Sequence, residues 1–297
     1  MGAEQSISEA DAAAAAAAPP AFLHQPWREI KWGDNQSALQ YVKNYKPHAE
    51  GQQVRILLHG PVGAGKSSFI NSVQSVLHGR MYTLALADNT SDCSFTKKYT
   101  TYKIQKGGPD SFYPFVFNDI MGLDRNGVPV DDVRLALQGH VKDGYRFNPV
   151  SKMSNDDPYF NQCPAANDIV HVLVCVVPAD TVHPIKDEMV KKIREIREEA
   201  SSLGIPQMAI LTKIDMTCPE IQGNLKKVYL SRHVKKKMEQ FSADVGIPMN
   251  CIFPVKNYHD EIDLNSDVDS LILSALKHII THGDDFINRK NQTDGSV

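Results

Sequence analysis

The 297-residue sequence lacks several features that would have pointed to common protein classes. Its five cysteines include no CxxC pair, a pattern that fits neither a disulfide framework nor a clustered zinc site and favours a reducing compartment. Lys plus Arg number 32 and Asp plus Glu number 35, so the net charge of −3 provides no overall positive field to attract nucleic acid. The longest apolar run in the body, 171–178, is far shorter than the roughly 18 residues that span a bilayer. We therefore expect a cytoplasmic globular protein without a sequence-specific nucleic-acid ligand.

The N-terminal composition indicates where the folded part begins. Seven consecutive alanines at 12–18 precede two prolines, and such a stretch buries too little apolar area to offset the entropy of ordering. We expect a disordered leader at 1–24, a packed segment at 25–50, one domain at 51–288 and a flexible tail at 289–297. Within the packed segment, Asp34 is the expected N-cap of a short helix that carries Val42.

Apolar strands and amphipathic helices alternate from Val54 onward. The expected strands are 54–58, 97–104, 115–119, 170–177, 207–211 and 250–255, and the expected helices include 69–77 and lie near 131–137, 187–203, 220–241 and 268–286. This spacing predicts a mostly parallel, doubly wound α/β sheet with helices on both faces.

A glycine-rich motif, G-x-x-x-x-G-K-[ST], stands between the first of these strands and the first helix of the α/β part. In such a loop, backbone N–H groups surround phosphate groups, and the following helix N-terminus adds partial positive charge. Lys66 is the residue expected to contact the terminal phosphates, and Ser67 is expected to ligate Mg²⁺. The candidate binding residues are Gly60, Val62, Gly63, Ala64, Gly65, Lys66, Ser67 and Ser68.

Two further motifs distinguish among nucleotides. Asp119 and Gly122 form a D-x-x-G at the end of a strand, where Asp119 can hold Mg²⁺ and the Gly122 N–H can meet a γ-phosphate. Thr212, Lys213 and Asp215 form a T-K-x-D after a later strand. The Asp215 carboxylate accepts two hydrogen bonds, which matches the N1–H and N2–H₂ donors of guanine, a pair that adenine lacks. The three motifs together predict a guanine-nucleotide site.

This trio resembles the Ras-like or TRAFAC class of GTPases, which implies the Ras-like P-loop GTPase fold and GTP, GDP and Mg²⁺ as ligands. By that resemblance, Thr96 is the candidate switch residue and a third Mg²⁺ ligand beside Ser67 and Asp119, with Thr90 as the alternative. Val255, Lys256 and Asn257 stand where the class usually has Ser-Ala-Lys, and their backbone would meet the guanine O6.

Several longer stretches are similar to the interferon-induced protein 44-like family of G-domain proteins. The similarity extends over roughly 25–288 and rests on RILLHGPVGAGKSSFINSVQSVL (55–77), FTKKYTTY (95–102), NDIMGL (118–123), GHVKDGYRFNP (139–149), HVLVCVVPA (171–179), LTKID (211–215) and FPVKNY (253–258). The resemblance implies a cytoplasmic GTP-binding protein of the innate immune response.

Two positions, one after D-x-x-G and one in the glycine-rich loop, indicate slow or unconventional hydrolysis of GTP. Many switch GTPases place a Gln directly after D-x-x-G to orient the attacking water, whereas this chain has Leu123. Val62 also puts a branched side chain where an arginine finger would approach. A nucleotide-gated effector is the favoured interpretation, and a P-loop ATPase or nucleotide kinase and an interaction scaffold with a vestigial G domain are the alternatives.

Partners and membrane contact are weakly specified by the sequence. An unidentified protein partner or a pair of G domains is compatible with the fold. The N-terminus fits the M-G-x-x-x-[ST] myristoylation pattern, with Gly2 as the acceptor, and one such chain gives at most weak membrane association. The lysines at 226–237 favour a solvated helix face over a nucleic-acid or lipid site.

Overall fold

The computed structural model describes residues 21–85, 97–108, 110–123, 127–181 and 187–294. Its centre is a six-stranded sheet in the order β2-β3-β1-β4-β5-β6. The strands are β1 (Val54–His59), β2 (Thr100–Gln105), β3 (Phe112–Asp119), β4 (Val172–Pro178), β5 (Gln207–Thr212) and β6 (Ile252–Pro254). Every neighbouring pair is parallel except β2 and β3, which are antiparallel. The α/β prediction is confirmed.

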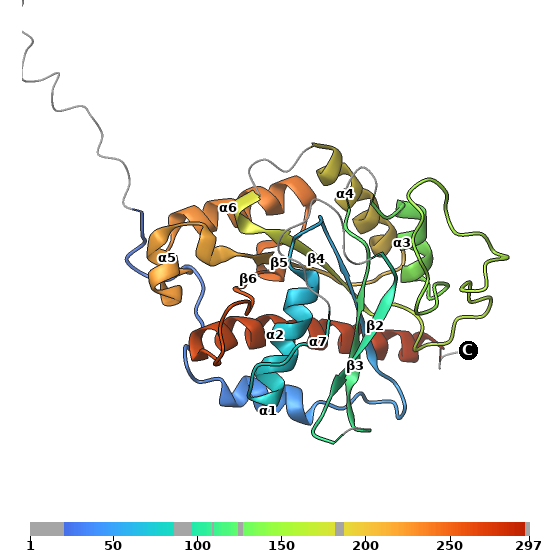
Figure 1. Cartoon of the computed structure of the whole chain (residues 1–297), viewed down its shortest axis with the longest axis horizontal. Coiled ribbons are helices and arrows are strands. Elements are labelled where there is room, and N and C mark those ends of the chain that lie inside the picture. Colours follow the sequence, from blue (N-terminus) through green and yellow to red (C-terminus); the bar gives the residue numbers. More distant parts are fainter. Residues whose placement is uncertain (1–20, 86–96, 109, 124–126, 182–186, 295–297) are drawn as a thin grey trace, which may run out of the picture.

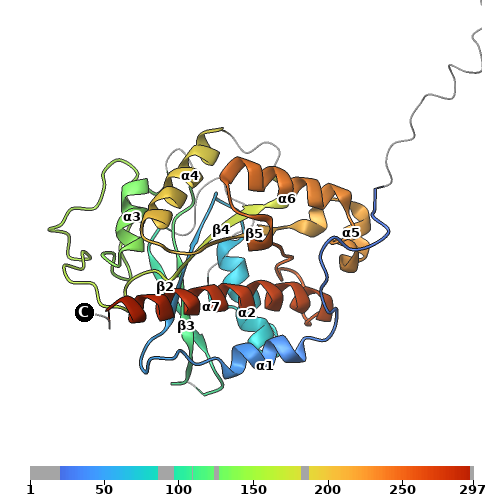
Figure 2. The same ribbon diagram turned by 180° about the vertical axis from the view of Figure 1, so that it is seen from behind.

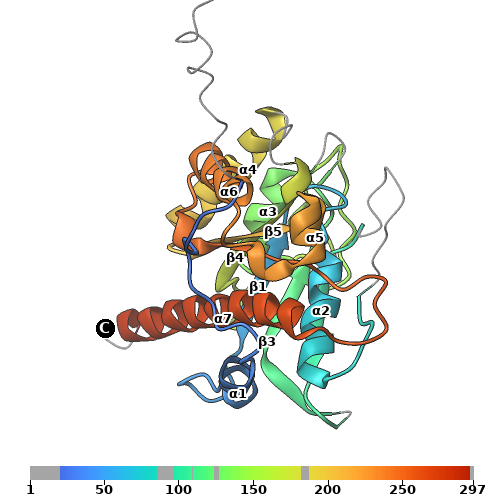
Figure 3. The same ribbon diagram turned by 90° about the vertical axis from the view of Figure 1, so that its left-hand side faces the viewer.

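Helices cover both faces of the sheet (Figures 1 and 3). One layer contains α1 (Gln36–Asn44), α2 (Lys66–His78) and α7 (Ser266–Asp294), and the other contains α3 (Val130–Leu137), α4 (Asp187–Ser202) and α6 (Arg232–Val245). Seen from behind, α7 crosses the sheet with α1 beside it (Figure 2). Every residue of β4 is buried, as expected for a central strand packed on both sides. None of the described helices is long and apolar enough to cross a membrane.

The segment before β1 lies along the domain. Phe22 forms a bridge with Ser231, so contacts with the domain begin before residue 25. The Trp27 ring lies 5.1 Å from the ring of Tyr229, and α1 packs on α7. The predicted cap at Asp34 is wrong: the N-cap is Asn35, whose side chain instead bonds to α7.

Two helices differ from their predicted bounds. The stretch predicted as one helix at 220–241 divides into α5 (Pro219–Gly223), the 3₁₀ turn η4 (Leu225–Lys227) and α6. Asn224 is extended, with φ −154° and ψ 100°, and its side chain caps η4; Ser231 then caps α6 by accepting from the Val234 N–H. At the other end, α7 continues past 286 to Asp294, so 289–294 are helical.

Short 3₁₀ turns complete the connections between the elements. They are η2 (Ala179–Thr181) after β4, η3 (Ile214–Met216) after β5 and η5 (Met249–Cys251) before β6. Of these, η3 carries Asp215, the last residue of the T-K-x-D motif, at the carboxyl end of the sheet.

Both edge strands of the sheet are met by side chains. On β2, the Thr101 N–H donates to Asp143 Oδ1 (2.6 Å) and the Gln105 N–H donates to Gln74 Oε1 (3.3 Å). At β6, the Arg28 guanidinium donates to the carbonyls of Ile252 (2.7 Å) and Met249 (2.5 Å).

Candidate functional site

The glycine-rich loop connects β1 to α2 and lies directly against β4. Gly60 has φ +142°, and a Cβ built there would stand 2.0 Å from the Val176 carbonyl oxygen. Gly65 is the N-cap of α2 with φ +86°, which an L side chain rarely adopts. The loop therefore requires glycine at these positions to hold its backbone against the sheet.

Lys66, Ser67 and Asp119 meet beside this loop. Lys66 is only 7% exposed, and its Nζ donates to the carbonyls of Gly60 (3.4 Å) and Pro61 (3.3 Å). Ser67 Oγ donates to Oδ2 of Asp119 (2.5 Å), which is fully buried at the end of β3. A hydroxyl and a carboxylate oxygen are hard oxygen donors of the kind that Mg²⁺ prefers, so these residues fit the implied metal.

The turn after Asp119 packs on the glycine-rich loop. A Cβ at Gly122 would stand 2.5 Å from Val62 Cγ2 and 2.7 Å from the Val62 nitrogen. The Leu123 N–H donates to the Gly60 carbonyl (2.9 Å), and the Leu123 side chain is fully buried. The position after D-x-x-G therefore sends its side chain into the core.

The T-K-x-D segment follows β5 and contacts the same loop. Thr212 is fully buried, and its Oγ1 donates to the Ala64 carbonyl (2.6 Å). Lys213 has φ +55° and is exposed. The Asp215 carboxylate is half-buried and accepts no hydrogen bond from the part of the chain that the structure describes.

The segment after β6 is a third contact on this loop. Asn257 Nδ2 donates to the Gly65 carbonyl (3.0 Å), while Oδ1 of Asn257 is buried and has no partner among the described residues. The Val255 N–H donates to Leu211 (2.7 Å), and the Lys256 ammonium donates to Glu261 (2.6 Å). The lysine side chain is thus held by a neighbouring carboxylate, and it is Asn257 that reaches the loop.

Two titratable side chains near Lys66, His59 and Cys175, are held in their uncharged forms. Burial and then the Lys66 charge lower the pKa of His59 to about 3, so this 2% exposed imidazole is neutral near pH 7. Burial raises the pKa of the Cys175 thiol to about 12 although Lys66 opposes the shift, so the thiol is also neutral. His59 was not among the residues predicted from the motifs; its polar side chain at the end of an apolar strand was the available signal.

The structure brings together most of the residues predicted from the motifs. Ser68 lies in the first turn of α2, and Gly63 stands in open space in the loop with φ +71°. Thr96, its alternative Thr90 and Gly2 lie outside the described residues. The described residues contain no group of three or more His, Cys, Asp or Glu side chains able to hold a metal.

Sheet order, loop geometry and these contacts define the G-domain fold of P-loop GTPases. Crystal structures of Toc33 from Arabidopsis thaliana share the fold: a dimerization-deficient mutant aligns with a TM-score of 0.50 and 14% identity, covering 85% of this chain and 93% of that one. A structure of Toc33 in complex with GDP and Mg²⁺ aligns with a TM-score of 0.48 at the same identity and coverage. No protein-family model matches the chain.

The chain is a homologue of interferon-induced protein 44 and interferon-induced protein 44-like. It is 34% identical to the human protein 44 over 254 residues, which cover 84% of this chain and 57% of the relative. Its identity to human protein 44-like is 32% over 250 residues, 83% of this chain and 55% of the relative. The family resemblance is confirmed, and the chain spans a little over half the length of these relatives.

Proposed function

We propose that the chain binds GTP and GDP with Mg²⁺ and acts as a nucleotide-gated effector of the interferon-induced, antiviral type. The observation that carries the proposal is the hydrogen bonding of the two base-side segments to the phosphate loop. Thr212 bonds to Ala64 at 2.6 Å and Asn257 to Gly65 at 3.0 Å, at adjacent carbonyls. These bonds bring together segments that lie 148 and 192 residues after the loop residues they contact. Their meeting at one loop supports a single nucleotide site.

Each part of the ligand has a matching group in this arrangement. Backbone N–H groups of 60–67 would surround the phosphates, and Lys66 would turn from the loop carbonyls to the terminal phosphates. Ser67 and Asp119 would hold Mg²⁺, which when bound neutralises phosphate charge. Asp215 would accept from the N1–H and 2-amino group of guanine, because its carboxylate has no competing donor among the described residues.

Hydrolysis is expected to be slow. Leu123 offers no polar group to orient water, and its side chain is fully buried. Val62 fills the space beside Gly122, within 2.5 Å of where a Cβ would stand. We expect a kcat below about 1 s⁻¹ in the presence of Mg²⁺.

Isothermal titration of GTP, GDP and ATP into the purified chain with Mg²⁺ tests the proposal. We expect both guanine nucleotides to bind and ATP to bind at least tenfold more weakly, since adenine leaves the Asp215 carboxylate unpaired. Equal affinity for ATP would favour an ATPase or nucleotide kinase, and absence of binding to any of the three would favour a scaffold.

A protein partner is the second part of the proposal, and another copy of the chain is the first candidate. Toc33 has a mutant described as dimerization-deficient, so at least one protein of this fold self-associates. Light scattering of the chain with GDP, and with a non-hydrolysable GTP analogue, measures its mass in each state. A nucleotide-dependent dimer supports the effector model; partner binding that persists in Lys66→Ala, with nucleotide binding lost, supports the scaffold.

A further inference from the structure

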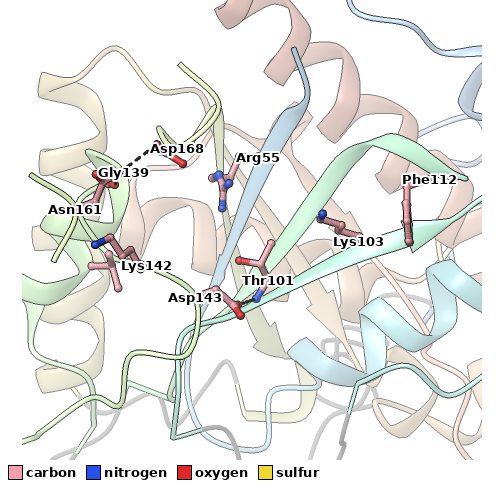
Figure 4. Close-up of a pocket in the computed structure, with 10 residues that line it drawn as sticks. Arg55, Thr101, Lys103, Phe112, Gly139, Lys142, Asp143, Asn161 and Asp168 are labelled. Carbon is pink, nitrogen blue, oxygen red and sulfur yellow. Dashed lines mark hydrogen bonds between the residues drawn. The ribbon is translucent and has the colours of Figure 1, made fainter. Parts of the chain in front are cut away.

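A hollow of about 510 Å³ is lined by residues of β1, β2 and β3 and of the connection between α3 and β4 (Figure 4). Its floor is formed by Arg55 near the start of β1 and by Thr101 and Lys103 of β2. Its walls come from the connection between α3 and β4, including Lys142 and Asp168. None of the glycine-loop residues lines it, so it is separate from the proposed nucleotide site.

The carboxylates of this hollow are already engaged by uncharged donors. Asp143 Oδ1 accepts from the Thr101 backbone N–H at 2.6 Å. Asp168 Oδ2 accepts from the Ala165 N–H at 2.9 Å and from Asn161 Nδ2 at 3.1 Å. These bonds hold the Asp143 side chain against β2 and the Asp168 side chain within the connection between α3 and β4.

Three cationic side chains line the same hollow without a carboxylate partner. Arg55, Lys103 and Lys142 form no ion pair with any described residue. Arg55 is held in place because its Nε donates to the Asn167 carbonyl (2.7 Å) and its Nη1 to Asn118 Oδ1 (3.2 Å). A guanidinium fixed on one side keeps its remaining N–H groups in a set direction, which suits a carboxylate or phosphate.

Two further groups complete the recognition surface. Thr101 Oγ1 accepts from Asn118 Nδ2 (2.7 Å), so the hydroxyl hydrogen is free to be donated to a ligand. Phe112 is 45% exposed, and the Lys103 ammonium lies 5.8 Å from its ring centroid. The hollow thus combines hydrogen-bond donors, one apolar ring and three cations against two carboxylates, which leaves a net positive charge of one.

We propose that this hollow binds a carboxylate or phosphate group attached to an apolar or aromatic body. Arg55, Thr101 and Lys103 would bind the anion, and Phe112 would contact the apolar part. A free small metabolite and an acidic side chain of a protein segment carry this same chemistry. The inference does not depend on nucleotide binding at the glycine-rich loop.

A matched pair of probes, phenylacetate and its neutral amide phenylacetamide, tests the inference on the full chain, both without nucleotide and with GDP and Mg²⁺ added. The Val141 methyl signals in ¹H–¹³C spectra report on the hollow directly, because Val141 lines it. We expect phenylacetate to shift these signals with a Kd of about 1 mM or tighter, and the amide to bind at least tenfold more weakly. Equal binding of the two probes, or no shift with either, would overturn the proposal.

Variants separate this hollow from non-specific attraction. The double change Lys103→Met and Lys142→Met keeps the aliphatic stems and removes two charges; it should lower phenylacetate affinity at least tenfold. Lys191→Met, on the exposed face of α4, is the control and should leave the affinity unchanged. If the double variant and the Lys191→Met control lowered phenylacetate affinity equally, the hollow would not be a specific anion site.

A peptide probe distinguishes the two sources of the ligand. An N-acetylated Glu-Glu-Phe amide that binds more tightly than phenylacetate would identify a protein segment as the source, and tighter phenylacetate binding would identify a metabolite.

Discussion

The phosphate side and the base side of the candidate site are built differently. On the phosphate side, Lys66 and Asp119 are buried, and Ser67 and Asp119 are joined by a 2.5 Å hydrogen bond. On the base side, Asp215 is half-buried with no hydrogen-bond donor among the described residues, and the neighbouring Met216 is 63% exposed. The phosphate side is therefore part of the packed fold, whereas the carboxylate proposed to recognise the base lies partly exposed beside it.

Because of this difference, we expect substitutions on one side to change the stability of the fold and substitutions on the other to change the choice of nucleotide base. Changes on the phosphate side should disturb folding as well as binding, because backbone and buried polar groups there have no room to adjust. Changes at Asp215 should alter the choice of base with little effect on folding, because substitutions of exposed or half-exposed groups seldom cost more than about 0.5 kcal/mol.

The largest effect is expected from Gly60→Ala. The new methyl group would stand 2.0 Å from the Val176 carbonyl, at φ +142°, so β1 and β4 would have to separate. We expect the free energy of unfolding to fall by about 3–5 kcal/mol in urea denaturation. Gly63→Ala is the control: it has a positive φ but open space, and should cost about 1–2 kcal/mol. Similar losses for the two variants would show that contact with β4 is not the constraint.

Lys66→Ala should nearly abolish nucleotide binding. The lysine supplies a charged donor within a buried environment, so we expect GTP affinity to fall by about 100-fold or more in titration calorimetry. Lys191→Ala, on the exposed face of α4, controls for the loss of one positive charge. A GTP affinity within threefold of the parent would remove Lys66 from the phosphate site.

Asp215→Asn should change the preferred base without weakening the fold. An amide donates to a carbonyl and accepts from an N–H, which matches xanthine and mismatches guanine. We expect GTP affinity to fall by about tenfold to a hundredfold and xanthosine triphosphate affinity to rise, with an unchanged urea midpoint. An unchanged preference for GTP would mean that guanine is recognised elsewhere.

The smallest effect is expected from the ion pair between Lys256 and Glu261, in the segment after β6. Burial raises the pKa of Glu261, but hydrogen bonds from Lys256 and from the His259 backbone outweigh it and hold the pKa at about 2. Because the folded pKa is depressed, this stabilisation is present above about pH 4.5 and is lost as the pH falls toward 2.

Urea denaturation of Glu261→Gln across this range measures the contribution. The side chains are 28% and 29% exposed, so solvent screening reduces the expected loss to about 1 kcal/mol at pH 7 and almost none at pH 2. Glu220→Gln, on an exposed residue, should show no such dependence. A loss of the same size at both pH values would contradict the role of this charge pair.

Local patterns were sufficient to predict the sheet and the phosphate side. Apolar strands that end at glycine and aspartate predicted β1 and β3, because the motifs dictate backbone shape as well as chemistry. The direct hydrogen bond between Ser67 and Asp119 was not predicted. The break at Asn224 was missed, since the lysine-rich sequence around it is compatible with a continuous helix and only the cap geometry shows the interruption. The bond from Asn257 to Gly65 could not be predicted, because it joins residues 192 positions apart.

The side chains that meet the two edges of the sheet affect how this protein can associate with others. An open edge strand is a template for β-strand addition and for aggregation, and natural sheets block it with charged side chains or covering segments. Here the Asp143 carboxylate meets one edge, at Thr101, and the Arg28 guanidinium meets the other, at Ile252. We therefore expect copies of the chain that pair to meet through helices and loops, and loss of Arg28 or Asp143 to leave edge groups open to intermolecular strand pairing.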